Sequence, residues 1–313
     1  MIKDEAGTAP DGAVLVDAAF SAISRGTERL VLEGRVPRSE WERMRCPHQG
    51  GTFPFPVKYG YALVGTAQNG PHAGQRVFCL HPHQTRAAVS PDDVIPLPDA
   101  VPTQRAALAA NMETALTIVW DCGAAPGDHV LVVGAGVVGL LTARLLARHP
   151  GVIVTVCDVD DGKRGAAEAL GAKFSQPDDA PHNQDAVIHT SAVPAGLTTA
   201  LQAAAPGARV VEASWYGDRA VSVPLGEDFH VKRLTLRSSQ VGTIPPERSA
   251  RWSHRRRLST ALKLLEDPAL DCLLTHTIPF DEAPQRLPGL MNEPGPLAIL
   301  LAYPPFDRLP ETP

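Results

Sequence analysis

A glycine-rich turn near the middle of the chain places the tightest limit on its fold. Gly134, Gly136 and Gly139 have the spacing G-x-G-x-x-G, apolar residues precede them, and residues 137–148 have a helical pattern. In such a strand–turn–helix unit the first glycine permits a tight turn, the second lets the backbone approach a pyrophosphate, and the third allows close helix packing. Unpaired N–H groups at the helix N-terminus favour that anion. The turn therefore predicts a dinucleotide site with contacts from Gly134, Gly136, Val137, Val138 and Gly139.

An acidic residue ends the second strand of the same unit. Residues 152–157 are mostly apolar, and Asp158 follows them at the position where a carboxylate accepts hydrogen bonds from both ribose hydroxyls of an adenosine. Because the same carboxylate repels a 2′-phosphate, NAD is the predicted cofactor, ahead of NADP. The alternatives are a doubly wound domain without a nucleotide and an FAD site, although the FAD fingerprint usually opens a chain.

Composition excludes several classes of protein. With 313 residues, 44% hydrophobic and 20% charged, the chain is long enough for two globular domains. A net charge of −5 gives no support for a nucleic-acid partner. The five cysteines are scattered, which indicates reduced thiols and a cytoplasmic protein. No apolar run approaches the ~18 residues of a membrane span, so we expect no membrane association.

The two halves of the chain differ in the pattern of their apolar, Gly and Pro residues. Residues 12 to about 100 contain short apolar stretches separated by Gly and Pro, which predicts a mostly β domain. Residues 106–122 form an apolar helical run, and strands and helices then alternate at the spacing of a parallel sheet. Residues 247–265 are expected to form one long helix, and the tail 275–303 returns to short strands and a helix. The predicted fold class is α/β, with a doubly wound parallel sheet and a β-rich domain that the C-terminal tail completes.

Several short motifs resemble those of the medium-chain dehydrogenase/reductase family. They are Ile23-Ser-Arg-Gly-Thr-Glu28, Val57-Lys-Tyr-Gly-Tyr-Ala-Leu-Val-Gly65, Gly74-Gln-Arg-Val77, Pro126-Gly-Asp-His-Val-Leu-Val132 and Glu168-Ala-Leu-Gly-Ala172. The resemblance covers nearly the whole chain. It implies a GroES-like catalytic domain at 1–112, a Rossmann domain at 113–245, and a hinge helix with a return to the first domain at 246–313. It also implies a homodimer joined near residues 234–239.

The positions that hold catalytic zinc in related enzymes lack zinc ligands here. The resemblance places those positions, a Cys, a His and a second Cys or Asp, on Ser24, Tyr61 and Ala110. Ser and Tyr are not usual zinc ligands, and Ala has no donor atom. No cysteine cluster provides the structural zinc lobe either. We therefore expect no metal, and the chain is similar to the zinc-independent branch and to its bacteriochlorophyllide a dehydrogenase group.

Without zinc, side chains must polarise the substrate oxygen. Tyr61 is the first candidate because it stands at a metal-ligand position and carries a phenol; a packing role is equally favoured. Ser24 and Thr27 are hydroxyls on the loop that carries the metal in relatives, with turn hydrogen bonds as the alternative. His48 lies in a flexible loop and could shuttle a proton, with an exposed or core-satisfied histidine as the favoured alternative. Glu28 is expected to hold a structural ion pair.

The remaining assignments concern cofactor and substrate. The resemblance places Lys163 beside the ribose and Thr114 against the nicotinamide. Ser191 follows a strand end, where doubly wound sheets bind ligands. A small-molecule substrate is expected, and core packing or exposure is the alternative for each of its predicted contacts, Trp215, Tyr216, Met112 and His83.

The predicted function is zinc-independent, NAD(H)-dependent interconversion of a secondary alcohol and a ketone. One rival is an NAD(P)H-dependent enone or quinone reductase, and another is a dinucleotide-binding protein without activity. A basic run at residues 248–257 resembles a phosphate or nucleic-acid patch, but in an acidic chain a solvated helix face is the favoured interpretation.

Overall fold

The computed structural model describes residues 11–305 and divides the chain into two compact units. The first unit contains the residues up to Ala110, with 262–267 and those from 274 onward; the second contains 111–261 and 268–273. The first boundary therefore falls between Ala110 and Asn111. The return to the first unit begins at residue 262 rather than 246, so the segment 246–261 packs with the second unit.

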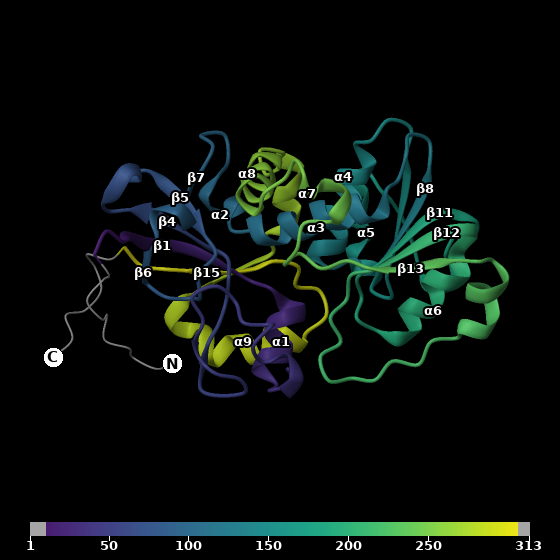
Figure 1. Ribbon diagram of the computed structural model, residues 1–313, viewed down its shortest axis with the longest axis horizontal. Helices are drawn as coiled ribbons and strands as arrows, with labels where there is room; N and C mark the ends of the chain where they lie inside the picture. Colours follow the sequence, from purple (N-terminus) through teal and green to yellow (C-terminus); the bar gives the residue numbers. More distant parts are fainter. Residues whose placement is uncertain (1–10, 306–313) are drawn as a thin grey trace. The chain divides into compact units, whose positions relative to one another are not determined.

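The second unit is built on a six-stranded parallel sheet with the order β10-β9-β8-β11-β12-β13. Helix α4 packs against β8 and β9, and α6 packs against β8, β11 and β12 (Figure 1). The strand order reverses beside β8, so the carboxyl end of β8 is the switch point where such sheets bind ligands. The strands are β8 His129–Val133, β9 Ile153–Cys157, β10 Lys173–Ser175, β11 Gln184–His189, β12 Ala204–Glu212 and β13 Thr235–Ser238. The helices are α3 Ala109–Cys122, α4 Val137–Ala147, α5 Arg164–Ala169, α6 Pro194–Ala203, α7 Pro246–Ser249 and α8 His254–Leu264.

The first unit contains a seven-stranded sheet in which β1 pairs with three other strands, β15, β4 and β6. The β1–β15 pairing joins residue 20 to residue 302, so the C-terminal tail completes this sheet as predicted (Figure 1). Its strands are β1 Val14–Ile23, β4 Leu63–Ala67, β5 Arg76–Cys79, β6 Arg86–Val89, β7 Ile95–Pro96, β14 His276–Pro279 and β15 Ile299–Ala302, and β2 Gly50–Gly51 pairs separately with β3 Val57–Lys58. Its helices are α1 Arg25–Leu32, α2 Thr103–Ala106 and α9 Ala283–Asn292.

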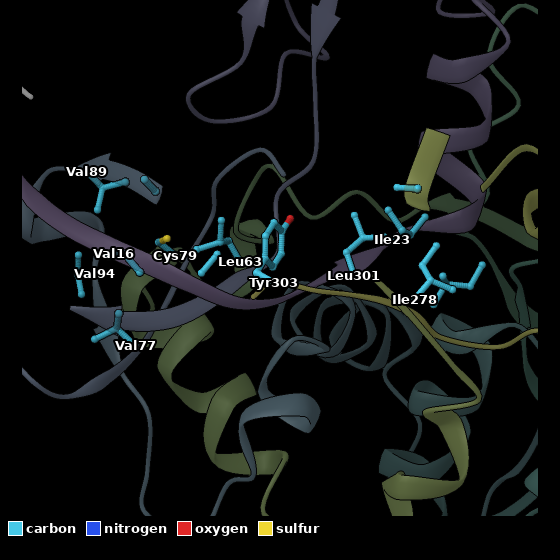
Figure 2. Packing of buried hydrophobic residues seen from close by; sticks show 14 of the residues in the cluster. Val16, Ile23, Leu63, Val77, Cys79, Val89, Val94, Ile278, Leu301 and Tyr303 are labelled. Carbon is cyan, nitrogen blue, oxygen red and sulfur yellow. The ribbon is translucent and has the colours of Figure 1, made fainter. Parts of the chain in front are cut away.

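The core of the first unit is formed by alternate residues of these strands. Val16, Leu63, Val77 and Leu301 have at most 1% of their surface exposed and belong to one cluster (Figure 2). Burying each such side chain contributes roughly 1.5–3 kcal/mol before conformational entropy is subtracted. Tyr303 also packs in this cluster, and its hydroxyl is a polar group that the core must satisfy.

Three expected elements differ in the structure. The predicted helix 247–265 is two helices, α7 and α8, because Ser253 starts the second one: its hydroxyl accepts the N–H of Arg256 and its carbonyl accepts that of Arg257. The run 106–122 is likewise divided between α2 and α3. The expected loop after β1 is the amphipathic helix α1, whose Leu30 and Val31 are buried. In the described part of the chain, every helix is too short or too polar to cross a membrane.

Candidate functional site

Two of the three glycines in the turn are required by their neighbours. Gly134 has φ +112°, and a Cβ on it would lie 2.8 Å from both the Ser191 nitrogen and the Thr190 hydroxyl. A Cβ on Gly139 would lie 2.0 Å from the Gly134 carbonyl oxygen. Any side chain at these positions would force the end of β8, the start of α4 and the end of β11 apart.

Gly136 is different, because nothing within residues 11–305 requires a glycine there. Its backbone is extended, with φ −77° and ψ 176°, and a Cβ would meet no atom within 4 Å. It is the N-cap residue of α4, and no side chain caps that helix start. The open space and the uncapped N–H groups of Val137 and Val138 are what a close-approaching phosphate needs.

Asp158 lies beside the turn, as the sequence predicts. One of its carboxylate oxygens accepts the N–H of Ala135 at 2.7 Å, and the other accepts the N–H of Asp160 at 2.9 Å. The ammonium of Lys163 lies 3.7 Å from the same carboxylate and 4.0 Å from that of Asp160. Asp158 thus holds the turn in place, and each of its oxygens keeps a lone pair for a ribose hydroxyl.

A buried polar network supports Ser191 at the end of β11. The Ser191 hydroxyl is 2.7 Å from Nε2 of His189, whose Nδ1 is 2.7 Å from a carboxylate oxygen of Glu212. His189 has no exposed surface, while Ser191 is partly exposed. Burial acts to raise the pKa of Glu212, but hydrogen bonds from His189 and Ser214 lower it below its usual value. An ionised carboxylate therefore fixes the ring that holds Ser191.

Tyr216 belongs to the same network. Its hydroxyl donates to Glu212 at 3.1 Å, and burial together with that carboxylate raises the pKa of the phenol. The sequence predicts Tyr216 as a substrate contact, with core packing as the alternative; neither interpretation includes this hydrogen bond to Glu212. Trp215 is partly exposed beside it.

In the first unit, Tyr61 lies between β3 and β4 and contacts two other predicted residues. Its hydroxyl makes hydrogen bonds to those of Ser24 and Thr27. Burial and the nearby Glu28 carboxylate raise the pKa of Tyr61 to about 12, against the effect of the two hydroxyls. Ser24 is the N-cap residue of α1 and Thr27 lies in its first turn, so a helix rather than a loop presents them.

Behind this cluster a chain of hydrogen bonds runs into the core of the first unit. Nε2 of His83 is 2.8 Å from one Glu28 oxygen, and the other Glu28 oxygen accepts the Ser24 N–H at 2.8 Å. Nδ1 of His83 is 2.7 Å from the Ser21 hydroxyl, which is 2.8 Å from that of Tyr303. Glu28 is thus hydrogen-bonded through both of its oxygens, which agrees with a structural role. Both ring nitrogens of His83 are occupied, which favours a positioning role over the predicted substrate contact.

His48 lies outside this chain of hydrogen bonds. It has φ +57°, its ring stacks on His81 with centroids 5.0 Å apart, and its Nε2 is 3.4 Å from an Asp93 oxygen. Burial lowers the pKa of His81 to about 4, so that ring is neutral near neutral pH. Within residues 11–305, no hydrogen bond or ring contact joins His48 to Tyr61.

Two further predicted residues lie in α3. Thr114, which the resemblance places against the nicotinamide, lies in the second turn of this helix, which begins at Ala109. Met112 has no exposed surface, which favours core packing over the predicted substrate contact.

Sequence reasoning did not select the residues that hold these clusters. Ser21, Tyr303, His189 and Glu212 were not assigned roles, and buried Cys46 was treated only as a reduced thiol. Burial raises the pKa of the Cys46 thiol to about 12. The signal available for His189 and Glu212 was their shared position at the ends of two strands, since parallel neighbours bring such ends together.

Comparison with known proteins supplies relatives of the whole chain, although no protein-family model matches it. The 2-desacetyl-2-hydroxyethyl bacteriochlorophyllide A dehydrogenase of Cereibacter sphaeroides is 25% identical over 312 residues, covering 93% of this chain and 91% of the relative. An alcohol dehydrogenase of Escherichia coli CFT073, solved with NADH, is 18% identical with a TM-score of 0.74 and covers 96% of this chain and 94% of that one. An oxidoreductase of Salmonella enterica, solved with NADP, is 20% identical with a TM-score of 0.69 over 96% and 94% of the two chains. The two solved structures confirm the fold.

Proposed function

This chain belongs to the medium-chain dehydrogenase/reductase family, and we propose that it is a zinc-independent, NAD(H)-dependent enzyme that interconverts a secondary alcohol and a ketone. The observation that carries the proposal is a pairing of two features. The second unit has a dinucleotide turn with open space at Gly136. In the first unit, two of the three positions of the family's zinc ligands hold Ser24 and Tyr61, which hydrogen-bond to each other.

The donor chemistry at those positions does not fit zinc. The Tyr61 phenol has a pKa of about 12 and stays protonated, whereas a metal ligand must be deprotonated. Ala110 offers no donor atom. Among residues 11–305, no group of three or more His, Cys, Asp or Glu side chains could hold a metal ion. We therefore assign no step to a metal.

We assign polarisation of the substrate oxygen to Tyr61. Its protonated phenol can donate a hydrogen bond to a ketone oxygen and give up its proton as that oxygen becomes an alkoxide. Ser24 and Thr27 then donate to the phenolate and stabilise it. A bound nicotinamide supplies hydride exchange at its C4. In the reverse direction Tyr61 must first release its proton to solvent, and the phenolate then accepts the proton of the alcohol.

Cofactor preference follows from the carboxylates near the ribose. Asp158 and Asp160 lie together beside the turn, with one ammonium, that of Lys163, within 4.0 Å of each. The excess negative charge favours NAD over NADP, although similar folds have been solved with either. In the Asp158→Asn variant, the dissociation constant of NADPH divided by that of NADH is expected to fall about tenfold. Asp161→Asn, which changes an exposed carboxylate on the same loop, is the control.

We also propose a cytoplasmic homodimer that pairs through β13. This strand lies at one edge of the parallel sheet, and Leu236 on it is 37% exposed. An uncovered edge strand pairs readily with another chain. Mass measurement in solution tests the dimer.

The experiment that tests the function combines metal analysis with turnover. The purified protein is expected to contain no stoichiometric zinc and to oxidise NADH with a panel of ketones after treatment with a chelator. One tightly bound zinc per chain would contradict the ligand argument. Turnover on enones alone, with NADPH preferred, would support the reductase alternative, and NADH binding without turnover on either panel would support a binding protein.

A further inference from the structure

A second pocket in the nucleotide-binding unit is lined by arginines and shares no residue with the turn. It has a volume of about 310 Å³. Arg209 reaches it from β12 and Arg237 from β13, while Arg248 and Arg251 come from α7 and the turn after it. Trp120 near the end of α3, Pro245 and Glu247 complete the lining.

Two of these arginines are fixed by hydrogen bonds within the unit. Arg237 lies 2.9 Å from a carboxylate oxygen of Asp121 and 3.2 Å from one of Glu247. Arg209 donates to the backbone carbonyl of Asp121 at 2.8 Å. These bonds give the wall formed by β12 and β13 a rigid set of donors.

The other two arginines have no carboxylate partner within residues 11–305. Arg248 stacks on the ring of Trp120 with its guanidinium carbon 4.7 Å from the centroid, and Arg251 is exposed. Four guanidinium groups therefore face two carboxylates, Asp121 and Glu247. An excess of two positive charges is concentrated here in a chain whose net charge is −5.

The arginines of the basic run 248–257, for which the sequence favours a single solvated helix face, lie in different environments in the structure. Arg257 is 98% buried and pairs with Glu113 at 2.9 Å, and Arg256 stacks on Trp252 at 4.1 Å. Only Arg248 and Arg251 of the run line the pocket. A general nucleic-acid surface would need the run to lie on one face, and it does not.

We propose that this pocket binds the dianionic phosphate group of a small phosphorylated molecule, separately from the dinucleotide. Guanidinium groups offer paired N–H donors that match phosphate oxygens. The volume lies at the lower end of small-molecule pockets, which suits a phosphate or pyrophosphate. Because Arg248 already covers the face of Trp120, a nucleotide base has no ring free for stacking in this pocket. Recognition is therefore confined to the phosphate.

Calorimetric titration with inorganic pyrophosphate tests the proposal. The titration is made with and without saturating NADH, because pyrophosphate could also occupy the Gly136 turn. We expect binding in both cases, weakened by added sodium chloride because the contacts are ionic. The double variant Arg248→Gln/Arg251→Gln should lose affinity by about tenfold or more. Arg38→Gln is the matched control, since Arg38 also stacks on a tryptophan, Trp41, but lies in the first unit.

The proposal would be overturned by no binding at millimolar pyrophosphate, by binding that NADH abolishes, or by wild-type affinity in the double variant. Equal weakening in Arg38→Gln would also overturn it, as would a short DNA duplex that binds and resists competition by pyrophosphate. The NADH titration itself reports on the proposed cofactor. If the protein fails to bind NADH but binds pyrophosphate through these arginines, the proposed function is refuted and the proposed phosphate pocket is still supported.

Discussion

His83 and Glu28 form a buried pair in the first unit, with Nε2 of the ring 2.8 Å from a carboxylate oxygen. The pair connects a core hydroxyl, that of Ser21, to the N-cap of α1. Since α1 presents the hydroxyls that contact Tyr61, the pair positions the proposed catalytic group without touching substrate.

Glu28→Gln should therefore reduce both stability and turnover. The carboxylate accepts two hydrogen bonds, one at each oxygen, whereas the amide has only one oxygen to accept them. A broken buried hydrogen bond costs about 1–3 kcal/mol. Chemical denaturation measures the stability. Glu40→Gln, which breaks the surface pair with Arg43, should cost no more than about 1 kcal/mol. Equal losses in the two variants would show that the buried pair has no special role.

Tyr61→Phe should slow ketone reduction by about a hundredfold or more and leave the NADH dissociation constant unchanged. The variant keeps the ring and removes the proton donor. Steady-state turnover and fluorescence titration with NADH separate the two effects. Tyr59→Phe is the control, because the Tyr59 ring lies edge-on against Tyr61 with centroids 6.1 Å apart. Unchanged turnover in Tyr61→Phe would return this residue to a packing role.

Two glycine variants separate ligand binding from folding. Gly136→Ala should retain the thermal stability of the protein and weaken NADH binding by about tenfold, because the new methyl meets only space that the cofactor needs. Gly139→Ala should lower the free energy of unfolding by about 1–3 kcal/mol, since its Cβ overlaps the Gly134 carbonyl. Scanning calorimetry and NADH titration check both. Loss of stability in Gly136→Ala would show that the chain itself needs this glycine.

His81 should make the first unit sensitive to acid. Its pKa is about 4 in the folded protein, lowered by burial from an ordinary value near 6.5. Above pH ~6.5 both states are neutral; between there and pH ~4 the unfolded state binds a proton that the folded state does not, so stability falls as pH falls. His81→Asn should flatten this slope in denaturation curves between about pH 7.5 and pH 4.5. Exposed His230→Asn should leave it unchanged, and a wild-type slope in His81→Asn would refute the assignment.

The fold was predictable to the extent that local patterns encode it. The Gly134 turn, the acid at Asp158 and the alternation of strands and helices predict the parallel sheet, because each signal spans a few tens of residues. Residues 247–265 form two helices because of the hydrogen bonds of Ser253, and such bonds cannot be predicted from hydrophobic periodicity.

The site was predictable only in part, for a related reason. Tyr61, Ser24 and Thr27 were selected from a motif, and they do lie together. Their supporting pair, His83 and Glu28, is 55 residues apart in sequence, and no local pattern joins them. The pocket arginines come from two strands and from α7 and the turn after it, and only the folded sheet brings them together.

The pairing of β1 with β15 has a consequence for the order of folding. Ser21 and Tyr303 are hydrogen-bonded across 282 residues, so the first unit cannot close its sheet until nearly the whole chain has been synthesised. The parallel sheet, complete by residue 238, can form earlier. During that interval residues 20–23 of β1 present an unpaired strand edge. Nascent chains released before β15 would expose this edge, which makes them targets for chaperones and prone to aggregate.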